Sequence, residues 1–228
     1  MKLPTDNTHS SPDVVIIDYN LNNLFSVKHA CQHVGINARI SADKNDIAKA
    51  DALILPGVGA FGNAMQNLEK LDLIAPIIDS IQAQKPFLGI CLGLQLLFEE
   101  SDEFGHYKGL GVIPGQVQRF PGQTDTQQSL KVPFIGWNEV HTTSGKNWNN
   151  TPMMNTQDGE YMYFVHSNFV KPTAPEDILC VTKYKDFEYC SGIVKNNIFA
   201  VQFHPEKSAQ KGLEIYQNWG KSIQVQVS

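Results

Sequence analysis

Three continuous apolar runs constrain the fold of this chain more than any other feature of its sequence. The runs are Val14–Asp18, Ala52–Leu55 and Phe87–Ile90. Runs without polar alternation are typical of strands that are covered on both faces, as in a parallel sheet. Helical patterns follow them, among them 24–34, with Gly35 at its C-terminal cap, and 92–98. This alternation predicts an α/β fold with a mostly parallel, twisted sheet flanked by helices.

The pattern changes after about residue 105, where short apolar runs are broken by glycine, proline and asparagine. We expect strands over 161–165, 178–184, 188–194 and 198–203, a last helix over 209–219, and long loops over 129–158. The second and third of these strands are close enough in sequence to form a hairpin. The sheet is therefore predicted to include a smaller antiparallel portion.

Length and composition favour a single domain in the cytoplasm. A chain of 228 residues can form one stable α/β domain, which we expect over 13–228, after a flexible tail over 1–12. The tail lacks the apolar centre of a secretory signal, and no apolar run approaches the roughly 20 residues that cross a bilayer. A net charge of -5 without a basic cluster argues against a nucleic-acid partner.

Cysteine and histidine spacings give no support for a metal site. The four cysteines contain no Cys-x-x-Cys pair. His29 and His33 are one helical turn apart, but no carboxylate accompanies them, and Cys31 between them falls on the apolar face of the expected helix. Cys180 and Cys190 lie on neighbouring expected strands and could form a disulfide, although reduced, packed thiols are the rule in the cytoplasm. We expect neither a metal nor an organic cofactor.

Cys91 occupies the pattern of a nucleophile elbow. It directly follows an expected strand, precedes an expected helix, and has Gly89 and Gly93 two residues away on either side. Such a turn is sharp and strained, and the N-terminus of the following helix favours a thiolate. The alternative is a buried structural cysteine, because free cysteine is among the most buried residue types.

A base and an oxyanion site are also present in the sequence. His204 and Glu206 follow the expected strand over 198–203 and can point to the same side of an extended segment, so the carboxylate can orient the imidazole. The carboxyl ends of parallel strands share one edge, which would bring Cys91 and His204 to one crevice. The glycine loop 56–59 and the N–H of Leu92 can supply oxyanion donors, although such a loop can also hold a phosphate.

Together these segments resemble the class I glutamine amidotransferases over nearly the whole chain. The likeness is carried by Pro-Gly-Val-Gly-Ala-Phe at 56–61, Gly-Ile-Cys-Leu-Gly-Leu-Gln at 89–95, Gly-Trp-Asn at 136–138, Tyr-Phe-Val-His-Ser at 163–167 and His-Pro-Glu-Lys-Ser at 204–208. Within the family, the segments are most similar to the glutaminase subunits of histidine biosynthesis.

The resemblance implies a mechanism and a partner. Cys91 would attack the carboxamide carbon of glutamine, His204 would protonate the departing ammonia, and Glu206 would orient His204. The resemblance places Gly57, Val58 and Leu92 at the oxyanion; Gly59, Gln95 and Ser167 near the glutamine; and Pro133, Trp137, Asn138, Tyr163 and Lys207 towards a (β/α)₈-barrel synthase subunit. That subunit would receive the ammonia within a heterodimer.

Two parts of the chain depart from the family pattern. The family usually has Asp-Tyr-Gly-x-Gly-Asn after the first strand, whereas Asn20 and Asn22 replace both glycines here. Asparagine tolerates positive φ better than other residues with a Cβ, so the turn is expected to survive. Asn168 stands where the histidine-pathway subunits commonly have tyrosine beside the glutamine. Both departures bear on the identity of the partner more than on the chemistry.

Three other functions compete with this interpretation. The same glutaminase chemistry could feed a paralogous synthase that aminates a sugar for surface polysaccharides. The chain could instead be a non-catalytic module that binds a partner, although Cys91, His204 and Glu206 are all intact. A cysteine hydrolase that acts alone would need neither Gln95 nor the Gly-Trp-Asn segment at 136–138.

Overall fold

The computed structural model describes residues 11–20, 23–143 and 145–227, without the side chains beyond Ile223. Most of the predicted tail, residues 1–10, lies outside the described residues. No helix in the described ranges is long and apolar enough to cross a membrane.

Parallel strands form one half of the sheet. In spatial order they are β2 (Ala38–Ser41), β1 (Val14–Ile17), β3 (Ala52–Leu55), β4 (Phe87–Ile90) and β13 (Ile198–Val201). The predicted strands over 52–55 and 87–90 are confirmed to the residue, because a fully apolar run of four residues has few other ways to be buried. The last predicted strand, over 198–203, is shorter than expected and ends at Val201.

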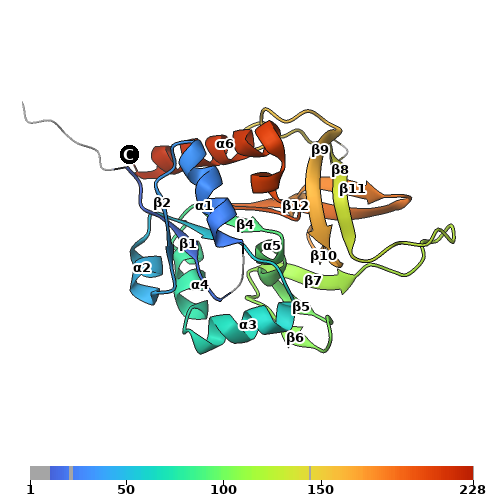
Figure 1. Cartoon of the computed structure of the whole chain (residues 1–228), viewed down its shortest axis with the longest axis horizontal. Coiled ribbons are helices and arrows are strands. Elements are labelled where there is room, and N and C mark those ends of the chain that lie inside the picture. The colour runs from blue at the N-terminus through green and yellow to red at the C-terminus, as the bar shows by residue number, and fades with distance from the viewer. Residues whose placement is uncertain (1–10, 21–22, 144, 228) are drawn as a thin grey trace, which may run out of the picture.

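Helices cover both faces of this parallel half. Val14 and Ile16 belong to the hydrophobic cluster that also contains residues of α1 (Leu24–His33) and α6 (Ala209–Val227). The alternate residues Val15 and Ile17 belong to the opposite cluster, together with residues of α2 (Lys44–Lys49), α3 (Phe61–Lys70) and α4 (Ile74–Gln82). Figure 1 shows α1 and α6 above the sheet and α3 and α4 below it. The predicted α/β fold class is confirmed.

Antiparallel strands form the other half. The path continues from β13 through β12 (Phe187–Lys195), β10 (Asn168–Pro172), β7 (Ile113–Arg119), β5 (Phe98–Ser101) and β6 (Tyr107–Lys108), with β5 and β7 parallel to each other. A branch of β11 (Ile178–Tyr184), β8 (Phe134–Thr142) and β9 (Glu160–His166) leaves at β12, with the short helix η1 (Pro175–Asp177) before β11. Figure 1 shows this branch at one end of the molecule. The predicted hairpin is the β11–β12 pair.

Two expectations about secondary structure are wrong. The helix expected over 92–98 is α5 (Leu92–Leu96), and the chain continues directly into β5. It leaves the helix because the carbonyl of Leu97 accepts hydrogen bonds from the N–H groups of Val112 and Ile113 instead. The loops expected over 129–158 contain the nine-residue strand β8, which pairs with β9 along seven positions. Both faces of β8 are partly exposed, so its sequence lacks the apolar alternation of a half-buried strand.

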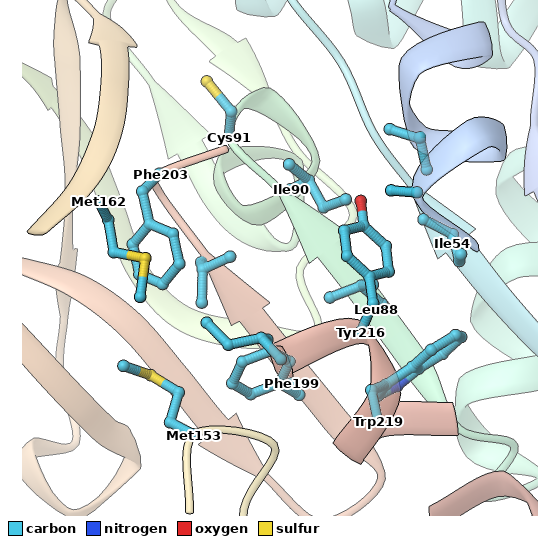
Figure 2. Close-up of a cluster of buried hydrophobic side chains, with 14 of the residues drawn as sticks. Ile54, Leu88, Ile90, Cys91, Met153, Met162, Phe199, Phe203, Tyr216 and Trp219 are labelled. Carbon is cyan, nitrogen blue, oxygen red and sulfur yellow. The ribbon is translucent and has the colours of Figure 1, made fainter. Parts of the chain in front are cut away.

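The core beneath Cys91 is apolar and well filled. Leu88 and Ile90 of β4, Phe203 after β13, and Tyr216 and Trp219 of α6 are all buried there, and Figure 2 shows them between the sheet and α6. All four cysteines, each within the described residues, are free. Cys180 and Cys190 are buried in opposite clusters on the two faces of the sheet, so they pack in the core and do not form a disulfide.

Candidate active site

Cys91 lies in the sharp turn between β4 and α5. Its backbone has φ 54 and ψ −106, a conformation that residues with a Cβ rarely adopt. Both flanking glycines are needed for close packing: a Cβ on Gly93 would overlap the carbonyl of Leu55, and one on Gly89 would approach the Cβ of Ala200 to 2.9 Å. The turn therefore fixes the cysteine at the carboxyl end of the central strand.

His204 and Glu206 follow β13, the strand next to β4. The Nδ1 of His204 is 2.7 Å from the Oε1 of Glu206, and neither side chain is exposed to solvent. Glu206 lies in the short helix η2 (Pro205–Lys207), which begins immediately after His204. The backbone N–H of Cys91 donates to the carbonyl of Val201 at 2.8 Å, which ties the two strand ends together. The structure thus brings the three predicted catalytic residues to one edge of the sheet.

The charge state of His204 depends on these neighbours. Burial acts to lower its pKa, but the adjacent Cys91 and Glu206 outweigh burial and raise the pKa of His204 to about 10. Its Nε2 is buried and has no hydrogen-bonding oxygen or nitrogen among the described residues. The Cys91 thiol instead donates to the carbonyl of Val165 at 3.7 Å. An imidazolium beside a cysteine is the arrangement that activates cysteine nucleophiles.

Asn23 also belongs to this group of side chains, although no sequence motif indicated it. Its Nδ2 donates to the Oε1 of Glu206 at 2.6 Å, so this oxygen is held by both Asn23 and His204. The backbone of Asn23 has φ 105, and Asn20 has φ 65, which confirms that asparagine can carry the positive φ of this turn. Asn22 lies outside the described residues.

The glycine loop adopts a conformation in which an oxyanion donor is occupied. The N–H of Leu92 donates to the carbonyl of Gly57 at 3.4 Å, so it is not available to a substrate oxygen. Beside it, the hydroxyl of Tyr19 donates to the carbonyl of Pro56 at 2.6 Å. Burial raises the pKa of Tyr19, and the nearby Cys91 adds to that rise, so the hydroxyl stays neutral and remains a donor.

A cavity of about 310 Å³ opens onto Cys91, within the size range of small-molecule sites. Six of the residues predicted for catalysis or substrate binding line it, namely Val58, Gly59, Cys91, Leu92, Gln95 and Ser167; Gly57, His204 and Glu206 do not. Glu103 also lines it, and no sequence motif pointed to this residue. Its carboxylate accepts hydrogen bonds from the Nδ2 of Asn168 at 2.6 Å and from the N–H of Phe61 at 2.7 Å. The cavity that holds the nucleophile is therefore also lined by an acidic side chain, which two hydrogen bonds hold in place.

The residues expected at a partner interface do not all lie on one surface. Trp137 is 50% exposed and packs edge-to-face on Tyr163, with ring centroids 5.9 Å apart. Pro133 lies at the cavity and Lys207 is exposed. Asn138 alternates with Trp137 along β8 and so points to the opposite face, and its Nδ2 donates to the carbonyl of Lys183 at 2.8 Å.

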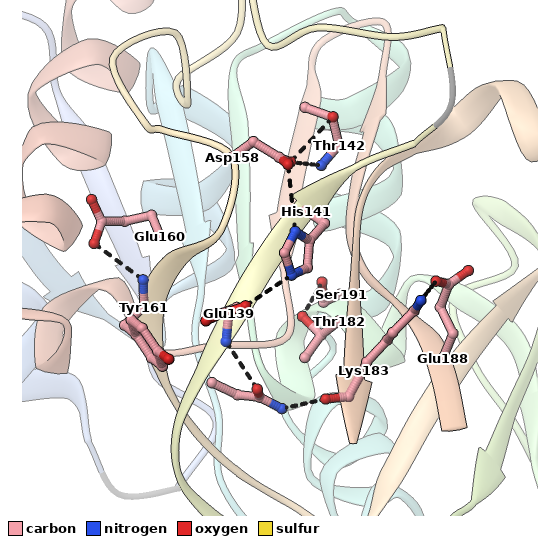
Figure 3. Close-up of polar contacts among 11 residues, drawn as sticks. Glu139, His141, Thr142, Asp158, Glu160, Tyr161, Thr182, Lys183, Glu188 and Ser191 are labelled. Carbon is pink, nitrogen blue, oxygen red and sulfur yellow. Dashed lines mark hydrogen bonds and ion pairs between the residues drawn. The ribbon is translucent and has the colours of Figure 1, made fainter. Parts of the chain in front are cut away.

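A polar cluster occupies the far end of β8. Figure 3 shows His141 between Glu139 and Asp158. Its Nε2 is 3.2 Å from the Oε2 of Glu139, and its Nδ1 is 3.5 Å from the Oδ2 of Asp158. Asp158 also accepts from the N–H of Thr142 at 2.6 Å. Within the described residues, no group of three or more histidine, cysteine or acidic side chains is arranged to hold a metal ion. These contacts stabilise the β8–β9 end of the branch.

Comparison with known families fits this geometry. The family model described as "Glutamine amidotransferase class-I" matches residues 15–221. The chain belongs to the class I glutamine amidotransferases. This amidotransferase is 46% identical over 211 residues to "Imidazole glycerol phosphate synthase subunit HisH" of Syntrophotalea carbinolica, covering 91% of this chain and 98% of that protein. A protein of the same name from Aquifex aeolicus is 42% identical over 211 residues, covering 92% and 97%.

Solved structures agree with the fold of this amidotransferase. A crystal structure of a glutamine amidotransferase has a TM-score of 0.69 at 15% identity and covers 92% of this chain and 98% of that one. The structure of PurLQS from Thermotoga maritima has a TM-score of 0.68 at 19% identity, with coverage of 96% and 100%. At such low identities the likeness concerns the fold alone.

Proposed function

We propose that this amidotransferase is the glutaminase subunit of an imidazole glycerol phosphate synthase, and that it hydrolyses glutamine to glutamate and ammonia. One observation carries the proposal: a cysteine in a strained strand-to-helix turn faces a cavity, with a buried histidine and glutamate beside it. The relatives named as HisH subunits, which the chain matches over nearly their whole length, support the pathway.

The chemistry follows from the three catalytic side chains. The thiolate of Cys91 attacks the carboxamide carbon of glutamine and forms a tetrahedral intermediate. His204 gives its proton to the nitrogen, ammonia leaves, and a thioester remains on Cys91. His204 then takes a proton from a water molecule that attacks the thioester, which releases glutamate and restores the thiolate. Glu206 keeps His204 oriented through its 2.7 Å contact.

The cavity offers complementary groups for glutamine. Gln95, Gly59 and Ser167 line the cavity near Cys91 and would bind the substrate's polar ends. The carboxylate of Glu103 is the charge that would recognise the α-ammonium group, because a fixed anion favours a cation at short range. An amide analogue without that ammonium group would then bind less tightly.

The loop conformation corresponds to a resting state. The carbonyl of Gly57 accepts a hydrogen bond from the N–H of Leu92, and the Cys91 thiol donates to the carbonyl of Val165. Rotation of the peptide between Gly57 and Val58 would remove that carbonyl and turn the N–H of Val58 towards the cavity. The oxyanion would then have two backbone donors, Val58 and Leu92. We infer that the partner triggers this rotation, so that ammonia is released only when it can be used.

The proposed partner is a (β/α)₈-barrel synthase subunit that forms a heterodimer with this chain in the cytoplasm. It would bind around Pro133 at the cavity, Trp137 of β8, Tyr163 of β9 and the exposed Lys207 of η2. Ammonia would pass into the barrel and yield imidazole glycerol phosphate and AICAR. Because the Asn138 amide is bonded to the carbonyl of Lys183, we expect its side chain to contribute less to the partner surface than Trp137.

The decisive experiment measures glutamate release from glutamine by the purified chain. The chain is tested alone and with the barrel subunit plus its phosphorylated ribonucleotide substrate, and Cys91→Ala is the control. A large partner-dependent rise that Cys91→Ala abolishes supports the proposal. Activity that depends on Cys91 but appears only with a sugar-aminating synthase would move the chain to that pathway, and inactivity with both partners would favour a non-catalytic binding module.

A further inference from the structure

Gln202 is a buried polar residue that lies against the nucleophile and has no role in the chemistry above. It follows β13 directly, just as Cys91 follows β4, and the last register pair of these two parallel strands is Val201 with Ile90. The next residues of the two strands are therefore neighbours. The Nε2 of Gln202 is 3.5 Å from the Sγ of Cys91, and Gln202 has no exposed surface.

A chain of hydrogen bonds fixes which end of the Gln202 amide faces the sulfur. The backbone carbonyl of Asn168 can only accept, so the Gln95 atom that lies 3.1 Å from it must be the donor Nε2. The same Nε2 is 3.0 Å from the Gln202 amide, so the Gln202 atom there must be the acceptor Oε1. The other end, Nε2, is then left to face Cys91.

The other end of this series of hydrogen bonds is fixed as well. The carbonyl of Asn168 also lies 2.7 Å from the Nδ1 of His166, whose Nε2 is 3.3 Å from the hydroxyl of Tyr189. Burial lowers the pKa of His166 to about 4, so near neutral pH the ring carries a single proton, which belongs on Nδ1 because a carbonyl can only accept. Tyr189 then donates to Nε2, and each bond has one permitted direction.

Two groups thus contact the sulfur. The carbonyl of Val165 can accept only from the protonated thiol, and it repels a thiolate. The Nε2 of Gln202 can donate to the thiolate, and hydrogen bonds to charged groups are stronger than neutral ones. The balance between these contacts changes in favour of Gln202 whenever the sulfur becomes negative.

We propose that Gln202 is a further catalytic residue, which donates its amide N–H to the Sγ of Cys91 and holds the sulfur as a thiolate. This inference rests on the proposed role of Cys91 as nucleophile. The bond assists before attack on the carboxamide, and again when the thioester breaks and the sulfur departs as a thiolate. Gln95 has a second role in addition to substrate binding, because it sets the direction of the Gln202 amide.

The first test is the rate at which iodoacetamide alkylates Cys91 in the chain alone, read by peptide mass spectrometry. Gln202→Glu keeps the size and the acceptor for Gln95 but removes the donor, and Gln202→Met removes both with little change in volume. We expect each variant to react at about one tenth of the wild-type rate or below, because a hydrogen bond to a charged group is lost. Asn218→Leu, which removes a buried carboxamide bonded to Pro152 and Asn155, should react at the wild-type rate.

A second measurement leaves Gln202 unchanged and so avoids any folding defect at that position. In ¹H–¹⁵N spectra, the side-chain amide proton of Gln202 should move upfield in Cys91→Ala, because its acceptor is gone. Alkylation within twofold of wild type in a folded Gln202 variant, or an unchanged Gln202 resonance, would overturn the inference. Neither test uses glutamine or a partner, so failure of the glutaminase assay would count against the proposed function and not against this contact.

Discussion

Leu92 donates its backbone N–H to the carbonyl of Gly57, which links the turn of the nucleophile to the glycine loop beside it. At 3.4 Å the bond is long, and it is weaker than one of ideal length. The glycine loop is therefore held in this conformation in large part by a second hydrogen bond, from the hydroxyl of Tyr19 to the carbonyl of Pro56. A loop held in this way can be released by a modest input of binding energy from a partner.

Tyr19→Phe should increase glutaminase activity without a partner. The substitution keeps the buried ring but removes the hydroxyl that holds Pro56, so the loop can rotate more easily. We expect several-fold higher basal glutamate release, a smaller stimulation by the partner, and a loss of about 1–3 kcal/mol in unfolding free energy because a buried carbonyl loses its donor. Steady-state kinetics and denaturant unfolding measure these changes. Basal activity at or below the wild-type level would contradict a restraining role.

Asn23→Gly should lower kcat with little change in KM. Glycine accepts the positive φ of this position, so the turn is kept while the donor to Glu206 is lost. A hydrogen bond to a buried carboxylate contributes roughly 1.5–3 kcal/mol, which predicts a fall in kcat of about tenfold or more. The control is Asn20→Gly, which also keeps a positive φ and removes no contact with Glu206. An equal loss in both variants would show that only the turn matters.

Acid should destabilise the protein partly through His166. The pKa of this buried ring is about 4 in the folded state against about 6.5 when unfolded, so the unfolded chain binds its proton first. The stability that neutral His166 contributes is present above pH 6.5 and is lost as pH falls to about 4. The loss amounts to roughly 3 kcal/mol. Denaturant unfolding between pH 7 and 4 should show a smaller fall in the free energy of unfolding for His166→Gln than for the wild type. Equal falls in the two proteins would argue against His166 as the origin.

Trp137→Ala and Lys207→Ala should weaken the complex with the barrel subunit. Trp137 is half exposed and supported by Tyr163, as expected of an interface anchor, and its truncation should cost about 2 kcal/mol, or roughly thirtyfold in Kd. Lys207→Ala should reduce coupling between the subunits more than glutamine binding. Titration calorimetry gives Kd, with Asn138→Ala as the matched control, because that side chain bonds to Lys183. Equal effects at residues 137 and 138 would contradict this assignment.

Local sequence was enough to predict the parts of the fold that are buried on two faces. Strands β3 and β4 appear as uninterrupted apolar runs, and Gly35 ends its helix with φ 80, as its position predicted. The partly exposed strand β8 carries no such signal. Its residues Ile135 and Trp137 point to the surface, and the strand exists because β9 and β11 pair with it.

The site was predictable only as far as its motifs. The elbow around Cys91 and the His-Pro-Glu segment have recognisable local patterns. Asn23 and Gln202 do not, because their roles depend on contacts with residues 183 and 111 positions away in the sequence. Glu103 likewise depends on contacts with Asn168 and Phe61, which are 65 and 42 positions away in the sequence.

The close packing of Gly93 against the carbonyl of Leu55 also limits how far the glycine loop can move. Leu55 is pressed against the nucleophile's helix, and the next carbonyl, that of Pro56, is bound by Tyr19. The pivot for any rotation must therefore begin at Gly57. In the proposed rotation the moving segment would be residues 57–59, with Val58 at its centre. Val58 and Cys91 line the same cavity, so a partner that triggers the rotation would have to act beside the nucleophile.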